Sequence, residues 1–149
     1  MPAASEPVPL PHTWRPFGVR MAGAVLGGGL LVVCALAWIA FDAETQAKFS
    51  WLQRGTVFFF GLLAFTLWFA LVRSRVVAEE GRLVVVNGYR RREFEWAEVI
   101  AVHLPPGAPW VTLDLADGTT VAAMGIQGSD GDRAKRSVRQ LRVLVNQAS

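Results

Sequence analysis

The 149-residue sequence contains a single cysteine and only two histidines. Cys34 has no second cysteine to pair with, so the chain is not a disulfide-stabilised secreted domain. His12 and His103 lie far apart, and no set of Cys, His, Asp and Glu residues has the spacing of a metal site. The sequence therefore predicts neither a bound metal nor any other cofactor.

Charge of one sign is not concentrated in the chain. There are 15 basic and 12 acidic residues, and eleven of the basic and nine of the acidic ones lie from Arg73 onward. A nucleic-acid-binding surface needs a basic stripe with little acidic admixture. We therefore expect no nucleic-acid partner.

Two runs, residues 21–41 and 55–72, contain no charged residue. As helices they would be about 31 Å and about 27 Å long, close to the roughly 30 Å of a bilayer's hydrocarbon core. The sequence therefore predicts a transmembrane hairpin over residues 21–72. A cleaved signal peptide is the alternative for the first run, although signal cores are only about 7 to 15 residues long. The second run would anchor the chain in either case.

The positions of lysine and arginine predict the orientation of the hairpin. The loop between the two runs has Lys48 and Arg54, whereas six arginines lie in the twenty residues after the second run: Arg73, Arg75, Arg82, Arg90, Arg91 and Arg92. Cytoplasmic flanks carry the excess of basic residues. We predict an inner-membrane protein with both termini in the cytoplasm.

The segment before the hairpin is rich in proline. Residues 1–20 contain five prolines and no apolar periodicity, so we expect a flexible cytoplasmic tail. Trp14 and Arg15 lie where a membrane headgroup anchor would be placed.

Gly23 and Gly27 have the spacing that lets two membrane helices approach closely. Our preferred interpretation is packing within the hairpin, against Gly61 of the second helix. A homodimer is the alternative, since one such glycine pair does not distinguish the two.

From residue 75 the pattern changes to short β-branched segments separated by turn signals. Asn87-Gly88 and Asp117-Gly118 are typical of hairpin turns. The pattern predicts six strands, at residues 76–78, 83–86, 89–96, 99–104, 110–115 and 119–124, and a seventh could lie in a loop. In the fourth strand, alternation would bury Ile100 and Val102 and expose His103.

A C-terminal amphipathic helix follows the predicted strands. Ser129 or Asp130 is expected to cap its N-terminus. Its apolar positions fall on one stripe, formed by Ala134, Val138, Leu141 and Val145. A helix of this kind is best buried across an open end of a curled sheet, which makes the fold class α+β.

Several local patterns together resemble one known family. They are 13–16 (TWRP), 96–99 (WAEV), 105–110 (PPGAPW), 115–119 (LADGT) and 134–144 in the helix. The chain resembles bacterial PH-like domain proteins of the low molecular weight protein antigen 6 type, which are small actinobacterial membrane proteins. The resemblance implies a cytoplasmic PH-like domain over residues 73–149, a bent seven-stranded β-sandwich or partial barrel closed by a C-terminal helix. It brings no catalytic residues.

Few residues suggest chemistry. His103 is expected on an outer face, with no nucleophile or paired carboxylate placed beside it, so we predict that the chain is not an enzyme. Arg90, Arg91 and Arg92 form the one basic run of the domain and are candidate contacts for lipid or a partner. The alternative is charge pairing with neighbouring Glu93 and Glu95.

The function predicted from these features is that of a membrane-anchored module that docks a protein partner at the cytoplasmic face of the membrane. An anionic-lipid-sensing domain is the alternative. Many PH domains bind phosphoinositides through basic residues between their first two strands. Here the first two predicted strands are joined by Glu79-Glu80-Gly81, which has the opposite charge. We therefore favour protein docking.

Overall fold

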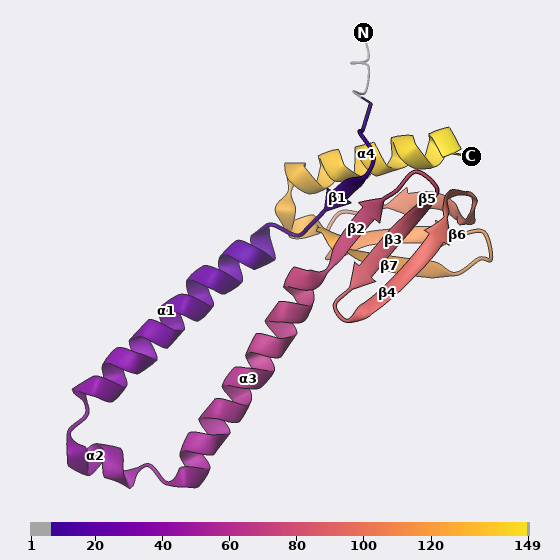
Figure 1. Cartoon of the computed structure of the whole chain (residues 1–149). Coiled ribbons are helices and arrows are strands. Elements are labelled where there is room, and N and C mark those ends of the chain that lie inside the picture. The colour runs from indigo at the N-terminus through magenta and orange to yellow at the C-terminus, as the bar shows by residue number, and fades with distance from the viewer. Residues whose placement is uncertain (1–6, 149) are drawn as a thin grey trace.

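The computed structural model, shown in Figure 1, describes residues 7–148. Two long antiparallel helices, α1 (Gly18–Ala40) and α3 (Trp51–Arg73), are joined by the short helix α2 (Ala43–Lys48). Both long helices connect to a β-rich domain at the same end of the hairpin, opposite α2. The arrangement is α+β, as predicted.

The two long helices match the two uncharged runs, and each is a few residues longer. In α3 the extension has a clear cause, because Ser50 and Gln53 form a capping box that starts the helix at Trp51. The Gln53 amide donates to Ser50 Oγ (3.3 Å), and the Ser50 amide donates to Gln53 Oε1 (2.9 Å). No residue of α1 or α3 is buried, and both helices are long and apolar enough to cross a membrane.

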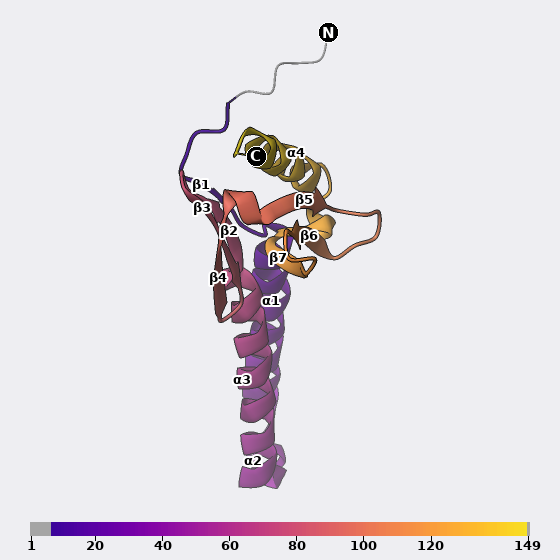
Figure 2. The same ribbon diagram turned by 90° about the vertical axis from the view of Figure 1, so that its right-hand side faces the viewer.

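The domain contains two antiparallel sheets. The first has the order β1-β2-β3-β4 and consists of β1 (His12–Trp14), β2 (Arg75–Ala78), β3 (Arg82–Asn87) and β4 (Arg90–Glu95). The second contains β5 (Val99–His103), β6 (Trp110–Leu115) and β7 (Thr120–Gln127). The short 3-10 helices η1 (Trp96–Glu98) and η2 (Gly128–Asp130) precede β5 and α4 (Asp132–Ala148). The sheets face one another without closing into a barrel, and α4 lies across their end away from the long helices (Figure 2).

All six predicted strands are present, and the seventh strand, β1, lies before the hairpin. Its His12 and Trp14 pair with Ala78 and Val76 of β2. The prediction of a flexible tail is therefore wrong for His12–Trp14; residues 1–6 lie outside the described part of the chain. Trp14 is only 5% exposed, so it is a core residue of the domain and no headgroup anchor. A three-residue strand between prolines is too short to show a recognisable period.

The position of β1 means that the helical hairpin is inserted into the connection between the first two strands of the domain. The chain crosses from β1 into α1 and returns from α3 directly into β2. The PH-like domain therefore includes β1 in addition to the predicted residues 73–149. Because β1 and β2 pair in one sheet, the segments before α1 and after α3 must lie on the same side of any membrane that the helices span.

The core lies between the two sheets and α4. Leu83, Leu113 and Leu141 are fully buried at its centre, one from each sheet and one from the helix. The apolar stripe predicted for α4 is confirmed, since all four of its residues are at most 4% exposed: Ala134, Val138, Leu141 and Val145. Burial of this stripe closes the end of the domain.

The predicted alternation of β5 is wrong at one position. The pairing of β5 with β6 shifts register between Val99 and Ala101. This β-bulge buries Val99 and leaves Ile100 62% exposed, the reverse of the prediction, while His103 is exposed as predicted.

Candidate functional site

Asp130 joins the domain to the start of α1. The backbone amides of Phe17 and Gly18 donate to its two carboxylate oxygens, at 3.0 and 2.8 Å. The first amides of a helix have no intrahelical acceptor, so Asp130 satisfies donors that would otherwise be free. The prediction that Asp130 caps its own helix is wrong: α4 begins at Asp132, and Asp130 caps α1 instead.

The end of α3 is joined to the turn between β3 and β4. Ser74 is fully buried, and its hydroxyl donates to Ala70 O (3.1 Å) and accepts from the Gly88 amide (2.9 Å). Gly88 has φ +60°, a turn conformation that glycine adopts without strain. It also lies against Ala70 of α3. The Tyr89 hydroxyl donates to Thr66 O (3.3 Å). Both long helices are thus bonded to the domain, which fixes its orientation on the hairpin.

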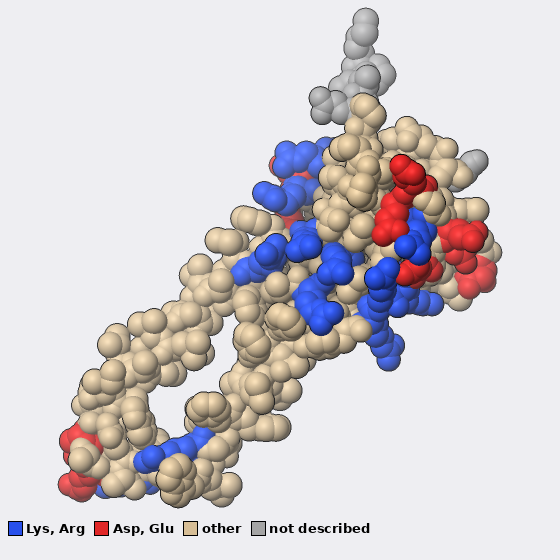
Figure 3. All heavy atoms as spheres, in the orientation of Figure 1, with Lys and Arg blue, Asp and Glu red and all other residues tan. Residues whose placement is uncertain are grey.

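The long helices touch one another close to the domain. The Trp68 indole donates to Val19 O (3.1 Å), and a Cβ at Gly23 would overlap this indole. Gly23 therefore packs against Trp68 and not against Gly61. No neighbouring side chain lies within 4 Å of where a Cβ at Gly27 would be. Figure 3 shows the helices separated over most of their length beyond this contact.

Basic and acidic side chains occupy different parts of the domain. In Figure 3 the Lys and Arg side chains gather where the domain adjoins the helices, and Asp and Glu side chains gather at the far end. Since β2 starts directly after α3, its other end and the turn at Glu79 point away from the hairpin. Here an open hollow of about 640 Å³ is lined by Glu79, Glu80, Glu95, Arg82 and Pro11. The hydrogen bond that the Arg82 guanidinium donates to the Glu79 carboxylate, together with the negative charges of Glu79 and Glu93, raises the pKa of Arg82.

The arginine run of β4 does not form a single patch. Side chains alternate between the faces of a strand, so Arg91 projects opposite to Arg90 and Arg92. Arg91 forms an ion pair with Glu93 (2.6 Å), whereas the Arg92 guanidinium lies 5.4 Å from the Phe94 ring centroid. Of the three arginines, Arg91 alone pairs with Glu93. Arg90, next to the β3–β4 turn, is exposed.

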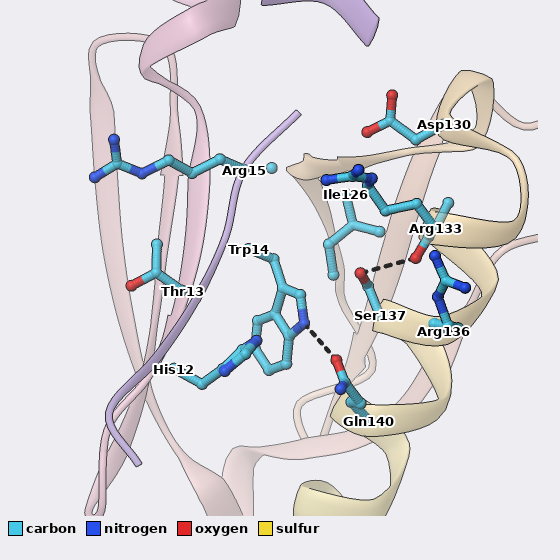
Figure 4. A pocket seen from close by; sticks show the side chains of 12 residues that line it. His12, Thr13, Trp14, Arg15, Ile126, Asp130, Arg133, Arg136, Ser137 and Gln140 are labelled. Carbon is cyan, nitrogen blue, oxygen red and sulfur yellow. Dashed lines mark hydrogen bonds between the residues drawn. The ribbon is translucent and has the colours of Figure 1, made fainter. Parts of the chain in front are cut away.

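A cleft of about 420 Å³ lies between β1 and α4 (Figure 4). Its apolar lining includes Trp14 and Ile126, and the Trp14 indole donates to Gln140 Oε1 (3.1 Å). Arg133 and Arg136 of α4 line the opposite wall, while the side chain of neighbouring Arg15 points away from the cleft. The sequence did not predict this cleft, because its two walls are more than a hundred residues apart and meet only through β1.

His103 forms one further polar contact. Its Nε2 lies 2.7 Å from Asp114 Oδ2, and both side chains are substantially exposed. Within residues 7–148 no three His, Cys, Asp or Glu side chains are grouped in a way that could hold a metal ion. Within residues 7–148 His103 thus forms an exposed hydrogen-bonded contact with Asp114, and its ring makes no hydrogen bond to a hydroxyl or thiol nucleophile.

Comparison with known proteins assigns the chain to a family. The profile of a family described as "Bacterial PH domain" matches residues 73–143. Uncharacterized proteins of Mycobacterium tuberculosis and Mycobacterium bovis are 34% identical over 140 residues, covering 91% of this chain and 85% of each relative. The chain belongs to the bacterial PH domain family. No solved structure matches it.

Within this bacterial PH domain, the connection between the first two strands is the helical hairpin itself. The family profile begins at Arg73, the last residue of α3, and so excludes β1. Glu79-Glu80-Gly81 joins the second and third strands, so its identification as the connection between the first two strands is wrong. The acidic charge of that turn consequently says nothing about the end of the domain that adjoins the two long helices.

Proposed function

We propose that the chain is a non-catalytic, membrane-anchored module whose PH-like domain docks a protein partner at the cytoplasmic face of the inner membrane. One observation carries the proposal: both long helices are bonded to the domain, through Asp130 and through Ser74. A domain held at two points keeps the same end directed away from the bilayer. That end carries the hollow lined by Glu79, Glu80 and Glu95 and is the surface accessible to a soluble partner.

The cytoplasmic location rests on the charge distribution. Arg15, Arg20, Arg73 and Arg75 flank the two helices at the domain end, whereas Lys48 and Arg54 are the basic residues of the opposite end. The positive-inside rule favours the cytoplasm for the domain. A reporter that is active only in the cytoplasm should therefore be active when fused after Ser149, and a periplasmic reporter should be silent there.

An anionic-lipid-oriented domain is the second candidate, supported by the concentration of arginines next to the helices (Figure 3). Each cation near an anionic surface contributes about 1 kcal/mol before salt screening. Arg90, Arg91 and Arg92 could add to this effect, with Arg91 weakened by its pairing with Glu93. For a homodimer formed through the Gly23 and Gly27 pair, Gly27 is the open position, because Trp68 already packs against Gly23.

Site-specific photo-crosslinking in living cells tests the docking proposal. A photoreactive residue in place of Glu80, in the hollow at the end of the domain away from the helices (the distal hollow), should give a discrete protein adduct. The same residue in place of Tyr89, which contacts α3, should give none. Substituting Glu79 and Glu95 with serine should abolish the adduct at position 80. Equal labelling at both positions, or an adduct that persists after these substitutions, would contradict docking at this end.

A further inference from the structure

The cleft between β1 and α4 is rich in hydrogen-bond donors. Arg133 and Arg136 contribute guanidinium groups, and His12 contributes a ring nitrogen. Because Gln140 Oε1 accepts the bond from the Trp14 indole, the Gln140 NH₂ group retains its own donors. Figure 4 shows the Arg133 side chain extending toward Ile126 and Gln140 facing Trp14, while Arg136 lies along α4 at the edge of the cleft.

The positive charge of the cleft is not neutralised within the protein. Among the ion pairs of residues 7–148, none involves Arg133 or Arg136. Asp130 is the one carboxylate that lines the cleft, and both its oxygens accept amides of α1. The two positive guanidinium groups outweigh this single carboxylate, so the cleft keeps a net positive charge that favours binding of an anion.

The Arg133 end of the cleft lies close to the start of α1. The uncharged run begins at Met21, and Phe17 precedes it by four residues, or about 6 Å along a helix. A headgroup layer extends roughly 5 to 8 Å beyond the hydrocarbon on each side of a bilayer. Asp130 is bonded to the Phe17 amide, and the Arg133 guanidinium lies 4.4 Å from the Phe17 ring centroid. Arg133, at this end of the cleft, therefore lies at the level of lipid phosphates, and Arg136 follows it about one helical turn further along α4.

We propose that this cleft binds a phosphate group, supplied by the headgroup of an anionic lipid of the adjoining leaflet. The guanidinium groups of Arg133 and Arg136 donate to the phosphate oxygens, for which the planar donor fork of arginine is well suited. The Gln140 amide and His12 donate to the remaining headgroup oxygens. The site differs from the arginine run of β4, which lies on the far strand of the first sheet, and it is independent of partner docking at the distal hollow.

Lipid retention by the full chain tests the proposal. The protein is purified in a non-ionic detergent, incubated with an equal mixture of phosphatidylglycerol and phosphatidylcholine, and examined by native mass spectrometry. We expect one retained phosphatidylglycerol per chain. The double variant Arg133→Ser with Arg136→Ser should retain at least about tenfold less, since charge-assisted hydrogen bonds are lost.

A matched variant separates this site from general charge effects. Lys135→Ser with Arg139→Ser removes the same charge from α4, at residues that line a different groove, and should leave retention unchanged. All four residues are exposed, so both variants should keep the wild-type thermal transition. Equal losses of lipid in the two variants, or no preference for phosphatidylglycerol in the wild type, would overturn the proposal.

Inorganic phosphate distinguishes the source of the group. With a lipid ligand, millimolar phosphate should neither displace phosphatidylglycerol nor raise the thermal transition of lipid-free protein. If phosphate stabilises the wild type, fails to stabilise the Arg133/Arg136 variant, and phosphatidylglycerol is not retained, the lipid source is wrong and the phosphate site stands. The absence of any effect of either probe would overturn the site altogether.

Discussion

The PH-like domain and the helical hairpin use the same kinds of side chain in opposite ways. Leu141 in the domain is fully buried against both sheets, whereas Leu62 in α3 is 65% exposed. Burying a leucine contributes about 1.5 to 3 kcal/mol, and only the domain obtains this from its own atoms. The hairpin is long and apolar enough to cross a membrane, where lipid would cover its apolar surface. The domain should therefore keep its stability without a membrane, and the hairpin should not.

The two regions are nevertheless interdependent, because β1 belongs to the domain but precedes the helical hairpin in the sequence. This strand places Trp14 in the core, and residues 73–149 alone do not contain it. The comparison between a self-sufficient domain and a lipid-dependent hairpin therefore holds only if β1 is counted with the domain.

The largest effect is expected when β1 is removed. A chain in which residues 16–73 are replaced by Asn-Gly would join β1 to β2 through a short hairpin connection, because Trp14 and Val76 are paired neighbours. We expect this chain to be soluble and to unfold cooperatively in urea. The fragment 74–148 should lack a cooperative transition, since a domain of about 75 residues has little stability to lose. Cooperative unfolding of both chains would show that β1 is dispensable.

Replacing one tryptophan in each region should distinguish the domain from the hairpin almost as clearly, by the loss of stability. Trp14→Ala empties a core position and should cost about 3 to 5 kcal/mol. Trp51→Ala, at a position 84% exposed at the start of α3, should cost less than about 1 kcal/mol. Hydrogen exchange of the β3 amides in the full chain, held in detergent, measures the loss of stability in each variant. Similar costs for the two variants would remove the distinction between core and lipid-facing tryptophans.

The smallest loss of stability is expected where Asp130 joins the domain to the start of α1. Asp130→Ala leaves the Phe17 and Gly18 amides without acceptors and should cost about 1 kcal/mol, the usual value for a helix cap. Asp132→Ala, which removes an exposed pair with Lys135 at 3.5 Å, should cost less than about 0.5 kcal/mol. Faster exchange of the amides at the start of α1 should appear in the first variant alone. If Asp132→Ala accelerates it equally, Asp130 is not the cap.

The sequence predicted those features that depend on local patterns. Uncharged runs of spanning length indicated both long helices, Asn87-Gly88 and Asp117-Gly118 marked two turns, and the stripe ending at Val145 identified the buried face of α4. The one error of alternation, at Ile100, came from a bulge, which inserts a residue without leaving a signal in composition. The capping box at Ser50 and Gln53 was present in the sequence and would have extended the second helix correctly.

Features that join distant segments could be decided only by the tertiary structure. His12–Trp14 has no strand signal of its own and is held in place by its pairing with β2, some sixty residues away in the sequence. The same pairing brings Trp14 to Gln140 and so creates the cleft, while Asp130, expected to cap the nearest helix, instead caps one that begins more than a hundred residues earlier. Local pattern reports the face that a segment buries. It does not report which other segment covers that face, because the free energy of such a contact arises only when both are brought together.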